Sequence, residues 1–381
     1  MTLMNKQMNK QMNKQMNKMN RLLHKQVNKQ MNRLLNKPAN IPGRQYVSLI
    51  LAGFLFVLFA GWPARHLQAQ DRSDTGPLGI ALENFDYPYP PEFLSLKMEG
   101  KDVRMAYMDV APTGEANGRT VLLMHGKNFF GAYWEDTIRL LAQNGYRVVV
   151  PDQIGFGKSS KPDVNYSFHQ MGQHTRQLLD TLGIDKAAVA GHSMGGMVAA
   201  RFALMYPDVA GQLILINPIG LEDYRIKTPW IPVSRIYENV LNTTEEAIRG
   251  YHEAYYVEWE PEYEVYVQVH YRWTLSGDYP RLARVSALTS QMFYEQPVIH
   301  EFPHIESPTL LIIGQEDRTA PGRNRAEPAI ARTMGYYPDL GKRAADMIPD
   351  AVLSEFENVG HSPHLESFDK FAETLLSFLE Q

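Results

Sequence analysis

From residue 95 to the C-terminus, short apolar runs alternate with longer amphipathic stretches. TVLLMHG (120–126), for example, is a continuous apolar run of strand length. SFHQMGQHTRQLLDTLG (167–183) repeats its apolar positions at helical spacing, with Leu178 and Leu182 on one face. This alternation predicts an α/β fold: a mainly parallel, doubly wound sheet with helices on both faces.

The same rule predicts the other elements. Strands are expected at 102–112, 146–152, 186–193, 211–218, 308–317 and 351–360, and helices at 134–145, 195–207 and 368–380. The strand at 102–112 alternates apolar and polar residues, which is typical of an edge strand. In sheets of this kind, ligands and chemistry lie beyond the carboxyl ends of the strands. The residues at those ends are His125, Asp152, Ser193, Asp317 and Gly360.

The first 70 residues follow a different pattern, which predicts targeting rather than folding. They hold seven Lys, four Arg and no acidic residue, and residues 4–20 repeat Met-Asn-Lys-Gln. Arg44 precedes the apolar run YVSLILAGFLFVLFAGW (46–62), and the small residue Ala69 follows it as a candidate cleavage position. A basic region, an apolar region and a small-residue site make a secretory signal. We expect residues 1–70 to direct export to the periplasm or the medium, with 46–62 either removed or kept as a tether to the inner membrane.

Composition excludes several classes of function. The chain has no cysteine, so disulfides and thiolate metal sites are excluded. Residues 1–70 hold 11 of the 38 Lys and Arg residues, so residues 71–381 hold 27 of them and all 42 Asp and Glu residues. The net charge of residues 71–381 is therefore about −15. A body this acidic is a poor partner for nucleic acid. We expect the partner to be a small-molecule substrate, and no oligomeric state is predicted.

A serine stands between glycines where a buried strand meets a helix. VAGHSMGGMVAARF (189–202) runs from an apolar strand directly into a helical pattern, with Gly191-x-Ser193-x-Gly195 at the junction. That spacing is typical of a nucleophile elbow, whose tight turn needs neighbours without side chains and lifts the serine hydroxyl above the sheet. The helix N-terminus there favours a developing negative charge. Ser193 is the predicted nucleophile.

A serine nucleophile needs a base, and the base needs a group that orients it. LLIIGQEDRTAP ends a buried strand in a turn, where Asp317 is the predicted orienting residue and Glu316 the alternative. FENVGHSPHLE ends the last strand, where His361 is the predicted base. His364, three residues later, is the competing base.

Two backbone amides are expected to bind the oxyanion. One belongs to Met194, the residue after the nucleophile. The other belongs to Lys127, because Gly126 lets the chain turn sharply after the strand that ends at His125. We expect His125 itself to tie down the loop backbone and to take no part in catalysis.

One further sequence motif has the residue spacing of a zinc site. HEFPH (300–304) has the His-Glu-x-x-His spacing of zinc peptidases, which requires a continuous helix. Pro303 interrupts any such helix. We therefore expect no metal and no cofactor.

Five ordered motifs resemble those of α/β-hydrolase-fold serine hydrolases, in the group that includes epoxide hydrolases, haloalkane dehalogenases and ring-cleavage carbon–carbon bond hydrolases. They are LLMHG (122–126), VVVPDQIGFGKSSKP (148–162), AGHSMGG (190–196), LLIIGQEDRTAP (310–321) and GHSPHLE (360–366). The resemblance implies a core at 71–220 and 304–381, with a helical cap inserted at 221–303.

Two departures narrow the function that the resemblance implies. Epoxide hydrolases and dehalogenases of this kind use aspartate where Ser193 stands, so alkyl-enzyme chemistry is not expected. Ring-cleavage hydrolases usually carry a Ser-Gly-Pro-Gly type of loop where this chain has Lys127-Asn128-Phe129-Phe130. The predicted function is hydrolysis of an ester or related acyl bond of a small, apolar substrate through an acyl-enzyme. The alternatives are carbon–carbon bond hydrolysis of a dienoate-type diketone and a non-catalytic binding module on the same fold.

Aromatic residues gather in the segment expected to form the cap. Tyr255, Trp259, Tyr263 and Tyr266 follow one another at helical spacing. They predict one aromatic helix face that either lines an apolar pocket or packs the cap against the core.

Overall fold

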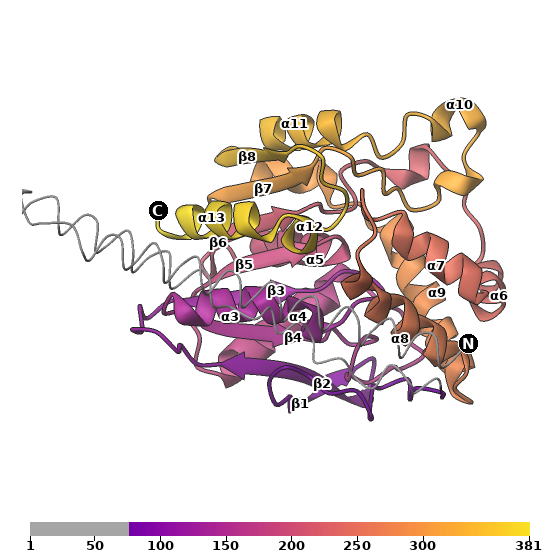
Figure 1. Cartoon of the computed structure of the whole chain (residues 1–381), viewed down its shortest axis with the longest axis horizontal. Helices are drawn as coiled ribbons and strands as arrows, with labels where there is room; N and C mark the ends of the chain where they lie inside the picture. The colour runs from indigo at the N-terminus through magenta and orange to yellow at the C-terminus, as the bar shows by residue number, and fades with distance from the viewer. Residues whose placement is uncertain (1–75) are drawn as a thin grey trace, which may run out of the picture. The chain divides into compact units, whose positions relative to one another are not determined.

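The computed structural model describes residues 76–381, and an eight-stranded sheet stands at its centre (Figure 1). The strands lie in the order β1-β2-β4-β3-β5-β6-β7-β8. β1 pairs antiparallel with β2 and β2 with β4, and all other pairs are parallel. Their bounds are β1 (Glu92–Met98), β2 (Lys101–Val110), β3 (Thr120–Met124), β4 (Arg147–Pro151), β5 (Ala187–His192), β6 (Ala210–Ile216), β7 (Thr309–Gly314) and β8 (Ala351–Phe356).

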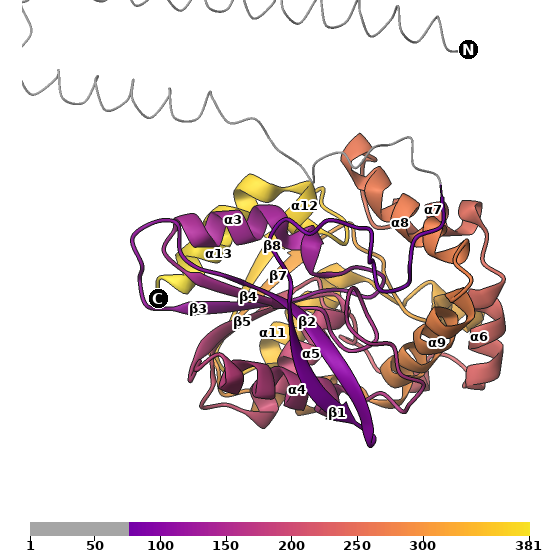
Figure 2. The ribbon, with the colours of Figure 1, turned by 90° about the horizontal axis from the view of Figure 1, so that it is seen from below.

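Helices cover both faces of the sheet, which explains why the parallel strands read as continuous apolar runs. Figure 2 shows α3 (Glu135–Gln143) and α13 (Phe368–Leu379) on one face, and α4 (Phe168–Thr181), α5 (Met194–Met205) and α11 (Tyr337–Met347) on the other. Each set packs against the strands in its own apolar cluster. Shorter helices in the connections are η1 (Gly131–Trp134), η5 (Arg323–Arg325), α10 (Pro328–Ala331) and α12 (Pro363–Glu366).

Between β6 and β7 the chain leaves the sheet and forms a group of helices at one end of it (Figure 1). They are η2 (Tyr224–Ile226), α6 (Val233–Leu241), α7 (Glu245–Glu253), η3 (Pro261–Tyr263), α8 (Glu264–Thr274), α9 (Tyr279–Glu295) and η4 (Ile299–His304). We call α6 to α9 the cap. The first described segment packs against it, because Leu78, Leu82 and Phe85 share a cluster with Val269 and Trp273 of α8.

The predicted α/β fold and doubly wound sheet are confirmed. The expectation of an edge strand at 102–112 is wrong, because β2 lies inside the sheet and β1 occupies the edge. β1 also alternates apolar and polar residues, with Leu96 and Met98 buried and Leu94 half-buried, so its pattern does not distinguish it from β2. The alternation at 102–112 belongs instead to an antiparallel strand that is paired on both sides.

The predicted export signal at 1–70 and the candidate tether at 46–62 lie outside the described residues. Within residues 76–381, no helix is both long and apolar enough to cross a bilayer. Export therefore stays a prediction from the sequence.

Candidate active site

Ser193 stands at the tight junction between β5 and α5. Its backbone lies at φ 56° and ψ −119°, a conformation that is strained for a residue with a side chain. The turn has no room for neighbouring side chains. A Cβ on Gly191 would lie 2.1 Å from the carbonyl oxygen of Gly195, and a Cβ on Gly195 would lie 2.2 Å from that of Met124. The glycines that flank the serine are thus required by close backbone approach.

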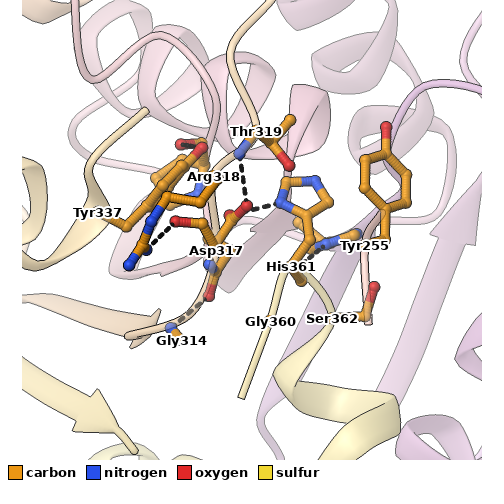
Figure 3. A network of polar contacts seen from close by, with 12 residues as sticks. Tyr255, Gly314, Asp317, Arg318, Thr319, Tyr337, Gly360, His361 and Ser362 are labelled. Atoms are coloured by element: carbon orange, nitrogen blue, oxygen red, sulfur yellow. Dashed lines mark hydrogen bonds and ion pairs between the residues drawn. The ribbon is translucent and has the colours of Figure 1, made fainter. Parts of the chain in front are cut away.

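Two other loops bring an acid and a histidine together. Asp317 follows β7 and His361 follows β8, and Oδ2 of Asp317 lies 2.6 Å from Nδ1 of His361 (Figure 3). Both side chains are fully buried. A carboxylate on Nδ1 keeps the proton on that nitrogen, so the lone pair of Nε2 is left to accept another.

The Asp317 carboxylate is held by two further hydrogen bonds. Nδ2 of Asn217 donates to Oδ2 at 2.7 Å, and the Thr319 amide donates to Oδ1 at 2.7 Å. Burial raises the pKa of Asp317, but the charge and hydrogen bond of His361, with those from Asn217 and Thr319, outweigh it and hold the pKa below its ordinary value. Sequence reasoning missed Asn217, although it directly follows the strand β6.

The loop that carries His361 is fixed from several sides. The Glu366 carboxylate accepts hydrogen bonds from the Gly360 amide at 2.9 Å and the Ser362 amide at 3.0 Å. The His361 amide donates to the carbonyl oxygen of Tyr255 at 2.7 Å. The Tyr255 ring lies beside the imidazole, with 4.5 Å between ring centroids (Figure 3). Glu366 stands in the motif GHSPHLE, which predicts no role for it, and its contacts show that it braces the histidine from both sides.

The alternatives at these two positions lie elsewhere. The Glu316 side chain is half exposed and reaches toward Arg318, at 3.7 Å. His364 is buried against Trp134, with 4.4 Å between ring centroids, and its two ring nitrogens have no hydrogen-bond partner among residues 76–381. Of the two acids and two histidines, the structure pairs Asp317 with His361.

The remaining parts of the site are placed but not joined to this pair. No hydrogen bond links Ser193 to Nε2 of His361, which has no partner in the described part of the chain. Such contacts commonly tighten only when substrate is bound. Within residues 76–381, the amides of Lys127 and Met194 likewise donate to no other group. Both remain available to an external acceptor.

The Lys127 side chain leaves the loop after β3 and reaches the cap. Its ammonium donates to the Ser286 carbonyl at 2.8 Å, to the Thr289 hydroxyl at 3.3 Å and to the Ser290 hydroxyl at 2.6 Å, all on α9. Burial lowers the pKa of Lys127 to about 7. The loop that carries a predicted oxyanion donor is therefore tied directly to the cap.

His125 makes the contacts expected of a residue that holds loop backbone. Its Nδ1 donates to the Gly126 carbonyl at 2.8 Å, and its Nε2 accepts from the Gln153 amide at 3.0 Å. Both ring nitrogens are thus occupied by backbone groups, and the side chain is fully buried.

A cavity of about 490 Å³ connects Ser193 to the cap. Its apolar walls include Ile219, Ile231, Ile236 and Phe293, and its polar walls include Lys127, Asn128, Tyr251, Tyr255, Gln291, Arg318, Arg323 and Arg325. Four cationic side chains and no carboxylate belong to this lining. Walls of this kind suit a small molecule with an apolar part and a negative charge.

The predicted aromatic helix face is wrong as drawn from the sequence. The helical spacing is broken, because α7 ends at Glu253 and α8 begins only at Glu264, after a turn that contains Pro261. Tyr255 lines the cavity. The alternative expectation, that these aromatic residues pack the cap against the core, is confirmed: Tyr255, Tyr263 and Tyr266 belong to an apolar cluster with residues of the sheet.

The His-Glu-x-x-His motif is divided among unrelated contacts. Its residues lie in the 3-10 turn η4, which contains Pro303. His300 is 2.9 Å from Asp223, whereas Glu301 binds Arg201. Among residues 76–381, no group of three or more His, Asp or Glu side chains is arranged to hold a metal ion.

Comparison with known proteins places the chain in a family. The model of the alpha/beta hydrolase family matches residues 121–374. The chain therefore belongs to the alpha/beta hydrolase family, and it is a hydrolase.

Individual relatives agree with that assignment. The crystal structure of a probable hydrolytic enzyme from Pseudomonas aeruginosa is 46% identical, with a TM-score of 0.79 over 81% of this chain and 99% of that one. A 2-hydroxy-6-oxononadienedioate/2-hydroxy-6-oxononatrienedioate hydrolase from Paraburkholderia phymatum is 27% identical over 76% of this chain and 96% of its own length. A 2-hydroxy-6-oxo-6-phenylhexa-2,4-dienoate hydrolase from Comamonas testosteroni is 26% identical over 75% and 95%.

Proposed function

We propose that this enzyme is a serine hydrolase that cleaves a carbon–carbon bond next to a carbonyl group in a small, negatively charged oxo acid. Ser193 is the nucleophile, His361 the general base and acid, and Asp317 the orienting carboxylate. The amides of Lys127 and Met194 bind the oxyanion.

The observation that carries this proposal is the charge of the cavity beside the nucleophile. Lys127, Arg318, Arg323 and Arg325 line it together with Ser193, and no Asp or Glu does. Lys127 already donates to α9, and Arg318 lies 3.7 Å from Glu316, but the buried Nε of Arg325 has no hydrogen-bond partner among residues 76–381. An acid would offer Arg325 a charge-assisted hydrogen bond that a neutral, apolar substrate cannot. The curated relatives at 26–27% identity are named as hydrolases of dienoates, which are acids of this kind.

The geometry supports a two-stage reaction. The Ser193 oxygen attacks the carbonyl carbon while its proton passes to Nε2 of His361, and the oxyanion accepts hydrogen bonds from the two amides. The carbon–carbon bond then breaks. Its electron pair leaves on the conjugated fragment, which takes the proton from His361. Water attacks the acyl-enzyme, gives its proton to His361 and releases a carboxylic acid, while Ser193 recovers its proton. Asp317 stays ionised throughout, so one water is consumed.

Ester hydrolysis is the second candidate, and one observation favours it. The loop after Gly126 reads Lys127-Asn128-Phe129-Phe130 and lacks the Ser-Gly-Pro-Gly type of sequence that ring-cleavage hydrolases usually carry. The same residues would act in the same order, with an alkoxide in place of the carbon leaving group.

Turnover of two probes separates the candidates. The purified protein is assayed with 2-hydroxy-6-oxo-6-phenylhexa-2,4-dienoate, whose absorbance falls on cleavage, and with 4-nitrophenyl butyrate. A kcat/KM at least tenfold higher for the dienoate supports carbon–carbon cleavage, and turnover of the ester alone supports the second candidate. If wild type consumes neither probe, or if the Ser193→Ala variant consumes a probe as fast as wild type does, the proposal is wrong.

We also infer that the enzyme works outside the cytoplasm. Support comes from the basic leader, the apolar run 46–62 and the small residue Ala69. Cell fractionation with N-terminal sequencing tests it. A mature terminus near residue 70, or an intact chain in the membrane fraction, supports export. Intact protein in the soluble cytoplasm overturns it.

A further inference from the structure

Three buried hydrogen bonds run in series from the loop after β3 to the histidine loop. The Gly126 amide donates to the Tyr133 hydroxyl at 3.1 Å. That hydroxyl lies 3.1 Å from Nδ1 of His192. Nε2 of His192 lies 2.8 Å from the carbonyl oxygen of His361. We call Tyr133 and His192 the relay.

The direction of every bond in the relay is fixed by chemistry. A carbonyl oxygen only accepts, so Nε2 of His192 carries the proton and donates to His361. Nδ1 of neutral His192 must then accept, which makes the Tyr133 hydroxyl its donor. The Tyr133 oxygen in turn accepts from the Gly126 amide. The series admits one arrangement of protons only.

Both relay side chains stay neutral. His192 is fully buried, and burial together with the neighbouring His364 and His361 holds its pKa well below the ordinary value. Burial raises the pKa of Tyr133 well above its ordinary value. Neither group changes its charge near neutral pH, so the arrangement of protons persists there.

The relay ends at the two groups that must be held relative to the nucleophile. Gly126 directly precedes Lys127, whose amide is the proposed oxyanion donor. A Cβ on Gly126 would lie 3.1 Å from Cβ of Ser193 and 3.2 Å from Nδ1 of His192, so this loop rests directly on the elbow. At the other end, Nε2 of His192 donates a hydrogen bond to the backbone carbonyl of His361 itself.

We propose that Tyr133 and His192 are positioning residues. They hold the Lys127 amide and His361 in the correct positions relative to Ser193. This inference rests on the proposed catalytic roles of Ser193, His361 and Lys127, and it holds for either bond that the enzyme cleaves. The groups at both ends act mainly in the transition state, so loss of the relay lowers kcat and leaves KM nearly unchanged. Small displacements of such groups cost up to about 100-fold.

The test is Tyr133→Phe, which removes one oxygen and keeps the ring that packs on Phe129 and Trp134. Active sites are counted by labelling with a fluorophosphonate. The rate constant of labelling and the kcat for 4-nitrophenyl butyrate are then expressed per titrated site. We expect both to fall by about 10- to 100-fold with KM within about twofold. A purely structural role would lower the number of active sites and leave the rates per site unchanged.

Two further variants complete the experiment. Tyr166→Phe is the matched control, because that buried hydroxyl donates to the Pro162 carbonyl at 2.8 Å, away from the site, and its loss should leave the rates per site unchanged. His192→Gln keeps a donor near the position of Nε2 and should lose less activity per site than His192→Ala.

The outcomes separate this inference from the proposed function. A wild-type protein that the fluorophosphonate does not label at Ser193 contradicts the proposed function. A labelled wild type, with Tyr133→Phe and His192→Gln both at wild-type rates per site, overturns the relay alone.

Discussion

Oδ2 of Asp317 lies 2.6 Å from Nδ1 of His361, and neither side chain is accessible to solvent. The two residues are 44 positions apart and follow adjacent parallel strands, β7 and β8. The contact sets the imidazole tautomer before any substrate arrives. Against the effect of burial, His361 above all, with Asn217 and Thr319, holds the pKa of Asp317 below its ordinary value. The acid–base half of the site is therefore already assembled in the free protein.

Asp317→Asn should lower kcat by about 10⁴-fold, because an amide at this place favours the wrong imidazole tautomer. Glu316→Gln is the matched control and should stay close to wild type, since its side chain is half exposed. Steady-state kinetics on whichever probe is turned over measures both. If Glu316→Gln loses activity and Asp317→Asn keeps it, Glu316 is the orienting residue.

His361→Ala should reduce turnover as severely as loss of the nucleophile, because the triad acts as a unit. His364→Ala should be much milder per titrated active site, since that ring packs on Trp134 and has no contact with Asp317. Equal and mild losses from the two variants would place the base elsewhere.

Arg325 should select negatively charged substrates. Its guanidinium lines the cavity, its buried Nε has no hydrogen-bond partner among residues 76–381, and no carboxylate shares the lining. Wild type should hydrolyse 4-nitrophenyl hemiglutarate at least tenfold more efficiently than 4-nitrophenyl valerate, which has nearly the same length. Arg325→Met should remove most of that preference and leave the valerate rate within about twofold.

The exposed Arg332, which is not part of the cavity lining, supplies the control for this comparison. Arg332→Met should keep the preference for the charged ester. Wild type with no preference between the two esters would contradict a cavity selective for acids.

His364 should make the fold sensitive to acid. Burial lowers its pKa to about 3, whereas an unfolded histidine titrates near about 6.5. Between these values the unfolded chain binds a proton that the folded chain does not, so the free energy of unfolding decreases as pH falls from about 6.5 toward 3. Each such group contributes about 1.4 kcal/mol per pH unit in this window.

His364→Phe removes that titration and keeps an aromatic ring against Trp134. Denaturant unfolding from pH 7 to 4.5 should show a shallower dependence on pH for the variant, by about one proton. Above pH 7 the difference between the two proteins should be constant. Parallel curves across the acid range would show that His364 does not titrate on unfolding.

The sequence predicted those parts of the site that depend on local pattern. The elbow around Ser193 is recognisable because its glycine spacing reports a single tight turn, and Asp317 and His361 follow strands that apolar runs reveal. Asn217 and Glu366 were not assigned roles, because their hydrogen bonds depend on which loops the sheet order brings together. Asn217, for example, is 100 residues from the aspartate that it binds.

Two errors have physical causes of the same kind. The edge strand was misplaced because β1 and β2 both alternate apolar and polar residues, and only the pairing of β2 with β4 shows which of them lies inside the sheet. The aromatic face of the cap was extended across Pro261, where the chain leaves α7 and starts again in α8. In both cases a local pattern was read without the pairing or packing that decides it.

Labelling of the full-length protein with a fluorophosphonate, followed by mass spectrometry of the modified peptide, tests the central claim most directly. We predict a single adduct on Ser193, no labelling of Ser193→Ala, and a loss of turnover in that variant on the order of 10⁶-fold with the fold intact. An adduct on another serine, or turnover that survives in Ser193→Ala, would contradict the account.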